Sequence, residues 1–138
     1  MLHLIKLSVG SESVDSLRRW QAMRRKQVGR VFHRTRMTPR RGAELLDGGS
    51  IYWVIKGVVR ARQRLIGLEP AVDENARRCV LLLLDPALVP TVPHAHRAFQ
   101  GWRYLSPEDA PADLVRAGDG AETIPAEMAA ALHELGLL

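Results

Sequence analysis

Two segments of the chain alternate apolar and basic side chains, and this alternation limits the folds available to it. In residues 30–37 the basic and aromatic members of the alternation are Arg30, Phe32, Arg34 and Arg36. In residues 58–66 the basic members are Arg60, Arg62 and Arg64. Because successive side chains of a β-strand point to opposite faces, a period of two predicts two strands that each bury one face.

The remaining segments predict an α+β chain. Runs rich in β-branched, aromatic or leucine residues predict further strands at residues 2–7, 51–55, 77–85 and 99–105. Capping residues and helical spacing predict helices near residues 13–27, 39–46, 109–117 and 125–135. Residues 69–75 are expected to form a loop, and three prolines in residues 86–98 favour an extended edge segment. We therefore expect a bent or barrel-like, mainly antiparallel sheet with flanking N- and C-terminal helices.

The length of 138 residues suits one domain spanning residues 1–138. The longest apolar run, 79–84, is about a third of what a membrane span needs and predicts a buried strand. The N-terminus lacks the pattern of a secretory signal, and the single cysteine, Cys79, is expected to be a buried thiol. These features favour a cytoplasmic protein without membrane contact.

Positive charge is concentrated in the first half of the chain. The formal net charge is +5, but residues 1–69 hold 15 Lys and Arg against 5 Asp and Glu, and residues 70–138 hold 5 against 10. Between Arg18 and Arg41 there are ten basic residues and no acidic one. A polyanionic partner would relieve the repulsion in this window, and so would packing of the acidic half against it. The 17 arginines against 3 lysines are also what a GC-rich genome would encode.

The arginines on alternate strand positions are candidate phosphate contacts. Alternate residues of a strand lie about 7 Å apart on one face, close to the spacing of phosphates in an extended single strand. Arginine binds phosphate through its planar fork, and an aromatic ring beside it can stack on a base. The competing interpretation is an outer sheet face solvated by charge. The candidate phosphate contacts are Arg34, Arg36, Arg40, Arg41, Lys56, Arg60, Arg62, Arg64 and Arg103, and the candidate stacking residues are Phe32, Trp53 and Trp102.

Four of the seven aromatic residues fall in two short predicted strands, as Tyr52, Trp53, Trp102 and Tyr104. With Lys56 or Arg103 nearby, such a cluster could hold a base and its phosphate. Aromatic residues on strands also build cores, so both interpretations stay open.

No catalytic, metal or cofactor motif is present in the sequence. His94 and His96 would point to one side of an extended strand, but two histidines without a third ligand favour a surface loop over a metal site. The chain has no Gly-rich phosphate loop, no paired cysteines and no nucleophile elbow. We therefore expect no cofactor, and a binding module rather than an enzyme.

Three stretches carry a resemblance to a known family: residues 47–57 (DGGSIYWVIKG), residues 99–105 (FQGWRYL) and residues 109–114 (DAPADL). Over nearly the whole chain the sequence resembles a family of small bacterial proteins that is catalogued as a domain of unknown function. The resemblance implies no activity. Residues 48–67 are also similar to a region of PUA-like domains, and this weaker similarity implies a small β-barrel of the kind found in proteins that modify RNA.

Three functions follow as hypotheses. The leading one is a module that binds RNA or another single-stranded polyanion, which predicts a steep loss of affinity with salt. The second is an enzyme or binder acting on a nucleotide or phosphate ester, with His94 or His96 as base. The third is an interaction domain that docks an acidic protein or a second copy of itself. The sequence does not predict the oligomeric state.

Overall fold

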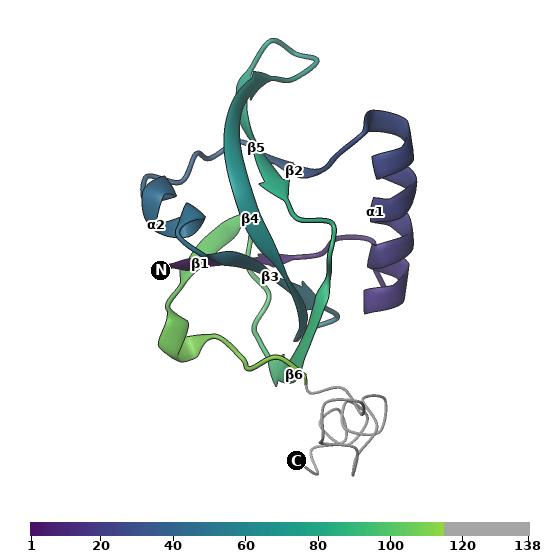
Figure 1. The fold of residues 1–138 in the computed structure, drawn as a ribbon, viewed down its shortest axis with the longest axis vertical. Helices are drawn as coiled ribbons and strands as arrows, with labels where there is room; N and C mark the ends of the chain where they lie inside the picture. Colours follow the sequence, from purple (N-terminus) through teal and green to yellow (C-terminus); the bar gives the residue numbers. More distant parts are fainter. Residues whose placement is uncertain (115–138) are drawn as a thin grey trace.

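The computed structural model describes residues 1–114 and consists of one sheet with a long helix on one side (Figure 1). The elements follow in the order β1 (His3–Leu7), α1 (Val14–Val28), β2 (Val31–Thr35), α2 (Gly42–Leu46), β3 (Ser50–Ile55), β4 (Val58–Val72), β5 (Arg78–Leu84), β6 (Val89–Ala95), β7 (Trp102–Leu105) and a 3-10 turn at Pro107–Asp109. The expected α+β class is therefore confirmed.

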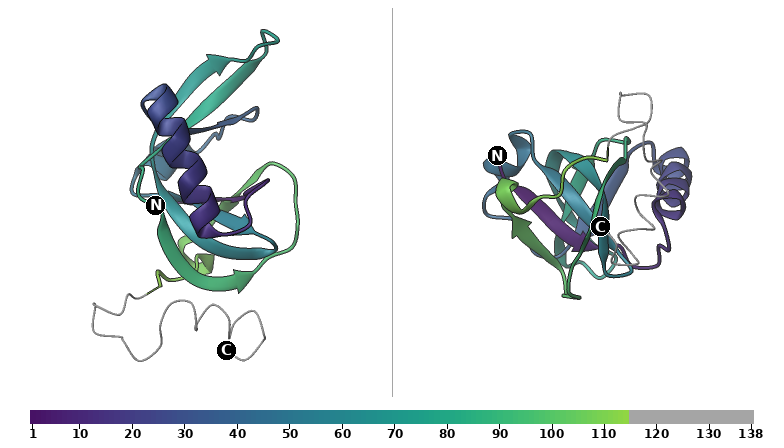
Figure 2. Two further views of the ribbon diagram at one scale, coloured as in Figure 1. Left: turned by 90° about the vertical axis from the view of Figure 1, so that its right-hand side faces the viewer. Right: turned by 90° about the horizontal axis from the view of Figure 1, so that it is seen from below.

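The sheet is open rather than a closed barrel. Its strand order is β2-β5-β4-β3-β1-β7, with β6 paired to β4. Only β1 and β3 pair in parallel among the described strands, so the expectation of a mainly antiparallel sheet is confirmed. The sheet curves strongly, as the side view shows, but β2 and β7 stay at its two ends (Figure 2). The expected barrel-like closure is therefore not found.

Strand β3 lies between two apolar clusters, one on each face of the sheet. All six of its residues are buried, and alternate side chains enter opposite clusters. Trp53 belongs to the larger cluster, which includes Leu17 of α1, and Tyr52 belongs to the smaller one on the other face. A strand that is apolar at every position is typical of a sheet covered on both sides.

Strand β4 is longer than its alternation predicts. It continues through residues 69–72, which the sequence indicated as loop, and pairs with β5 as far as Val72 opposite Arg78. The turn begins only at Asp73, whose carboxylate accepts hydrogen bonds from the backbone N–H groups of Asn75 and Arg77. An Asp whose carboxylate bonds the backbone in this way favours a turn. The strand therefore ends just before Asp73 and continues through Pro70.

Helix α1 begins and ends close to the expected residues. Ser13 caps its N-terminus, and the Ser13 and Ser16 side chains each bond the backbone of the other residue. Gly29 ends the helix with a positive φ of 90°, a conformation that glycine adopts at low cost. Leu17 and Gln21 form its buried side.

The segment after β7 differs from the prediction. A helix over 109–117 was expected, but residues 110–114 are extended in the described part of the chain, and Asp113 bridges to Thr91. Ala110 precedes Pro111, and a residue before proline disfavours the helical conformation. The expected helix at 125–135 lies outside the described residues. Cys79 is buried, as expected. None of the helices in residues 1–114 has the length and apolar character that crossing a membrane requires.

Candidate functional site

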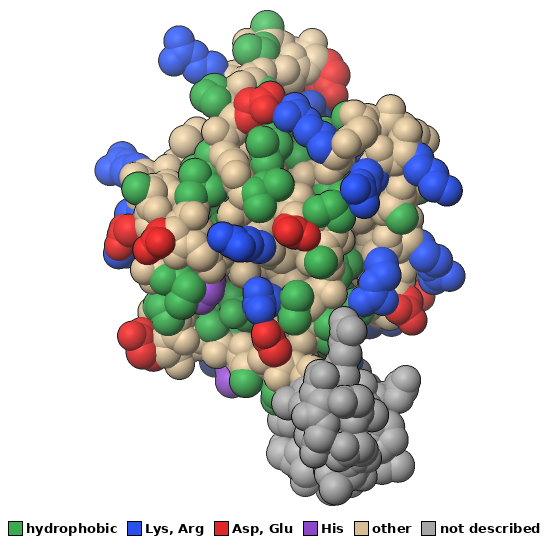
Figure 3. Space-filling model, viewed as in Figure 1, with side chains coloured by type: hydrophobic (Ala, Val, Ile, Leu, Met, Phe, Trp, Pro, Cys, Tyr) green, Lys and Arg blue, Asp and Glu red, His purple; other side chains and the backbone are tan. Residues whose placement is uncertain are grey.

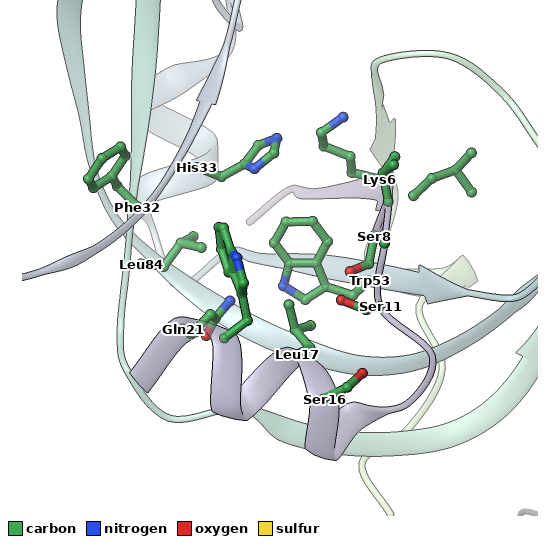
Figure 4. A pocket seen from close by; sticks show the side chains of 14 residues that line it. Lys6, Ser8, Ser11, Ser16, Leu17, Gln21, Phe32, His33, Trp53 and Leu84 are labelled. Carbon is green, nitrogen blue, oxygen red and sulfur yellow. The ribbon is translucent and has the colours of Figure 1, made fainter. Parts of the chain in front are cut away.

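A cleft of about 360 Å³ lies between helix α1 and strands β1, β2 and β3 (Figure 4). Side chains from all four elements line it, together with Leu84 of β5 and the loop that joins β1 to α1. The side chains that give the cleft its chemistry are Lys6, Ser8, Ser11, Trp20, Phe32, His33 and Trp53. It combines aromatic walls with one ammonium group and several hydroxyls.

A buried amide network fixes the distance between α1 and the sheet at this cleft. The side-chain amides of Gln21 and Gln63 exchange two hydrogen bonds, of 2.9 and 2.6 Å. The indole Nε1 of Trp53 also donates to Gln63 Oε1 at 3.0 Å, and Gln63 Nε2 donates to the Asp85 carbonyl oxygen. Buried amides that are fully bonded in this way hold one geometry, because any shift leaves polar groups unsatisfied.

Lys6 and His33 face the cleft in a partly dehydrated environment. Burial, and secondarily the positive charge of Lys6, lowers the pKa of His33 to about 4, so this imidazole is neutral at pH 7. Burial also lowers the pKa of Lys6. The His33 ring lies edge-on to Trp53, with ring centroids 5.4 Å apart. Figure 4 shows Lys6, His33 and Trp53 approaching the same space from β1, β2 and β3.

Beside the cleft, two arginines and two aromatic rings alternate in a stack that we call the cation–aromatic ladder: Arg30, Phe32, Arg24 and Trp20. The Arg24 guanidinium lies 5.1 Å from the ring centroid of Trp20 and 5.3 Å from that of Phe32. Arg30 lies on Phe32 at 5.8 Å. A second hollow, of about 520 Å³, continues past the same Trp20 and Phe32 rings toward Arg34. The ladder therefore separates two concave surfaces.

Trp20 is unusually open for a tryptophan on a packed helix. The residue is 46% exposed, and Arg24 follows it by one helical turn. Exposing the apolar ring of an indole to water is unfavourable unless another group packs on the ring. Here the Arg24 guanidinium packs on it. Trp20 and Arg24 thus present a stacking surface to solvent.

Three of the arginines predicted to contact phosphate are engaged in ion pairs. Arg34 pairs with Glu74, Arg41 with Glu44, and Arg62 with Asp113 through two hydrogen bonds of 2.6 and 2.8 Å. Arg30 is held by Glu69 in the same bidentate manner. The alternative of neutralisation by the later half of the chain is therefore correct for Arg34 and Arg62, whereas the partner of Arg30, Glu69, belongs to the first half. Figure 3 shows acidic and basic side chains intermixed on one face.

The arginines of β4 do not share a surface with the cleft. Gln63 bonds to α1, so Arg62 and Arg64, which alternate with it, lie on the face of β4 that points away from the helix. The register passes from Trp53 opposite Ala61 to Val54 opposite Val59, which makes Arg60 the extra residue of a β-bulge. Because of this bulge, Val59 and Ala61 enter clusters on opposite faces of the sheet, although they are two residues apart.

The other predicted residues lie apart from the cleft, with two exceptions. Trp102 is buried and donates its indole N–H to the Met37 carbonyl oxygen, a structural contact. Lys56 is exposed in the turn between β3 and β4, where its φ is 51°. Arg103 is exposed and lies over Phe99. Arg36 and Arg40 are exposed between β2 and α2. The exceptions are Phe32 and Trp53, which both line the cleft.

Tyr52 does not share a pocket with the tryptophans, whereas the Tyr104 ring packs edge-on to Trp102, with ring centroids 5.0 Å apart. Tyr52 is buried against His3 on the face away from α1. The Tyr104 hydroxyl accepts hydrogen bonds from the backbone N–H groups of Arg40 and Arg41, which fastens the segment before α2 to β7. The expected single aromatic pocket is therefore divided between two faces of the sheet.

The histidine pair does not form a site with the cleft. His94 is exposed on β6, and His96 packs edge-on to Phe99 with its Nδ1 2.9 Å from the Arg97 carbonyl oxygen. Neither lines the cleft. Across residues 1–114 no three His, Cys, Asp or Glu side chains gather as metal ligands would.

Sequence analysis missed Trp20, Arg24 and Lys6. None of the three is among the candidate phosphate contacts or stacking residues that the sequence predicts. One signal was available: Trp20 and Arg24 are four residues apart, the spacing that puts two side chains together on a helix.

A family model described as "Protein of unknown function (DUF1489)" matches residues 4–138. No curated protein matches the chain, and no solved structure does.

Proposed function

The chain belongs to the DUF1489 family, whose function is unknown, and from its own surface we propose that it is a binding module for RNA or other single-stranded nucleic acid. The observation that carries the proposal is the cation–aromatic ladder with its exposed Trp20 indole. The interface we propose is the side of α1 that carries the ladder, in place of the arginine strands.

Stacking is the first support. Single-strand binding proteins hold bases on aromatic side chains and phosphates on nearby cations, without needing a sequence motif. Trp20 offers nearly half of its surface, and the Arg24 guanidinium beside it can contact a phosphate while still lying on the ring.

Charge is the second support. On the solvent side of α1, Arg19, Met23 and Lys26 follow one another three or four residues apart beside Trp20. Within the part of the chain that the structure describes, Arg19, Arg24 and Lys26 form no ion pair with a carboxylate. They differ in this from Arg34 and Arg62. Cations without a carboxylate partner are the ones that attract a polyanion over distance.

The two other hypotheses have less support. An enzyme using His94 or His96 would need those imidazoles at a pocket, and neither lines the cleft. Docking of an acidic protein would use the same α1 cations but would not require the ladder. The ladder therefore favours a ligand with flat rings.

The test is binding of a fluorescently labelled single-stranded RNA of about ten nucleotides to three variants of the full chain. Trp20→Ala removes the stacking surface and Arg24→Ala removes its cation. We expect each to weaken binding about tenfold, because one stacked base contributes about 1–3 kcal/mol. Arg103→Ala is the matched control, because Arg103 is also an exposed arginine over an aromatic ring but lies on β7.

Equal loss of affinity in Arg24→Ala and Arg103→Ala, with no loss in Trp20→Ala, would mean that only net charge matters, and would exclude the ladder as the interface. Unchanged affinity in the Trp20 and Arg24 variants would have the same consequence. Since Trp20 and Arg24 both reach solvent, circular dichroism of each variant should match the parent and separates loss of binding from loss of folding.

A further inference from the structure

The cleft beside the ladder contains an ammonium group without an anionic partner. Lys6 is half-buried, and within residues 1–114 no carboxylate forms an ion pair with it. The cationic form of a lysine is disfavoured by dehydration, so a position like this gains most from a bound anion.

Two hydroxyl groups of the cleft are also uncommitted. Ser16 uses its hydroxyl to cap α1. Ser8 and Ser11 also line the cleft, and in the described chain their hydroxyls bond no other residue. Figure 4 shows both serines beside the Trp53 indole, on the side of the cleft reached by Lys6. A hydroxyl can donate to an anionic oxygen, so this end of the cleft offers an ammonium and two donors.

The other end of the cleft is aromatic. Trp20 and Phe32 line it, and Trp53 lies between the two ends, with its N–H already bonded to Gln63. The tryptophan therefore contributes the surface of its ring rather than a hydrogen-bond donor. A volume of about 360 Å³ is at the lower end of the range of about 300–1,000 Å³ for small-molecule sites, which suits a ligand of one nucleotide and no more.

From these three features we infer that the cleft is a binding site for one nucleoside monophosphate, with the base against the aromatic walls and the phosphate at Lys6, Ser8 and Ser11. The base is held by stacking, so the site accepts purines and pyrimidines. The phosphate is held by charge, so a nucleoside without it binds far more weakly. This inference does not depend on strand binding along the ladder.

Two sources supply this chemistry: a free nucleotide, and the 5′-terminal nucleotide of a phosphorylated strand. Because Trp20 and Phe32 belong both to the cleft and to the ladder, a strand that lies on the ladder could place its end in the cleft. Matched oligonucleotides with a 5′-phosphate or a 5′-hydroxyl distinguish the two sources.

The experiment is an NMR titration of the full chain that follows the three indole N–H signals. Trp20 and Trp53 line the cleft and Trp102 does not, so the Trp102 signal is an internal control. The probes are a nucleoside 5′-monophosphate, the same nucleoside, inorganic phosphate and the two oligonucleotides. Lys6→Met removes the ammonium, and Lys56→Met removes an equal charge at an exposed turn outside the cleft.

We expect the monophosphate to shift the Trp53 signal and to bind at least tenfold more tightly than the nucleoside. Lys6→Met should erase that difference and Lys56→Met should keep it, since a charge-assisted contact is worth about tenfold or more in affinity. A 5′-phosphate preference in the oligonucleotides identifies a strand end as the source, and its absence identifies the free nucleotide.

Failure of this inference is distinct from failure of the proposed function. If neither the monophosphate nor the phosphorylated strand moves the Trp53 signal, the cleft is not a nucleotide site, even when the oligonucleotides still bind through Trp20. Equal binding of nucleoside and monophosphate overturns the role of Lys6. Binding of the monophosphate with no binding of either oligonucleotide supports the cleft and overturns the strand-binding proposal.

Discussion

Replacing Gln63 with leucine should destabilise the protein more than any exposed substitution, because Gln63 makes four hydrogen bonds in the core. It is fully buried and bonds Trp53, Asp85 and, twice, Gln21. A buried hydrogen bond contributes about 1 kcal/mol, so Gln63→Leu should lower the free energy of unfolding by about 4 kcal/mol. Gln21→Leu breaks two of these bonds and should cost about 2 kcal/mol.

The double variant tests whether the two amides act as one unit. In Gln21→Leu with Gln63→Leu both partners of the amide pair are apolar, so no orphaned glutamine remains and the cost should stay near 4 kcal/mol rather than the sum of about 6. Urea denaturation followed by tryptophan fluorescence measures all three values. Gln27→Leu is the control, since Gln27 is exposed on the same helix and should change stability by less than about 0.5 kcal/mol.

Strict additivity in this cycle would refute the reasoning, because it would mean that each glutamine contributes independently. A Gln63→Leu variant within about 1 kcal/mol of the parent would refute it more directly. Either result would also remove the basis for a fixed distance between α1 and the sheet, on which the cleft depends.

Two further predictions concern the pH dependence of stability and one close backbone approach. Since the unfolded chain protonates His33 near pH 6.5 and the folded chain only near pH 4, stability falls as the pH drops through that window. Between pH 7 and pH 4 the parent should lose about 3 kcal/mol more than His33→Phe in urea titrations, and parallel pH profiles would contradict this. A Cβ at Gly49 would lie 2.1 Å from the Leu2 carbonyl oxygen and 2.4 Å from that of Leu45, so Gly49→Ala should lower stability by about 3 kcal/mol. At Gly10, which has a positive φ but open space, the same change should cost only about 1 kcal/mol by thermal melting.

Local sequence patterns predicted the strands well because the physics that forms them is local. Alternation between residues 61 and 65 follows directly from the two faces of a strand, and the buried run in β3 follows from its central position. The proline-rich segment was likewise expected to be an edge, and among the strands of residues 1–114 β6 pairs with β4 alone.

The candidate site was harder to predict because it depends on contacts between distant residues. The ion pair between Arg62 and Asp113 joins positions 51 residues apart, and the amide pair of Gln21 and Gln63 joins positions 42 apart. A single sequence does not show which carboxylate will meet which arginine. The exposure of the Trp20 ring depends on the position of α1 on the sheet, which the amide pair of Gln21 and Gln63 helps to fix.

The central claim is that the ladder side of α1 binds a polyanion, and the dependence of single-stranded RNA affinity on salt tests it most directly. If Arg19, Arg24 and Lys26 each contact one phosphate, the slope of log affinity against log salt is about −2 for a single strand. Affinity should then fall about twentyfold between about 50 and 200 mM salt. An affinity that stays constant over this range would contradict the account.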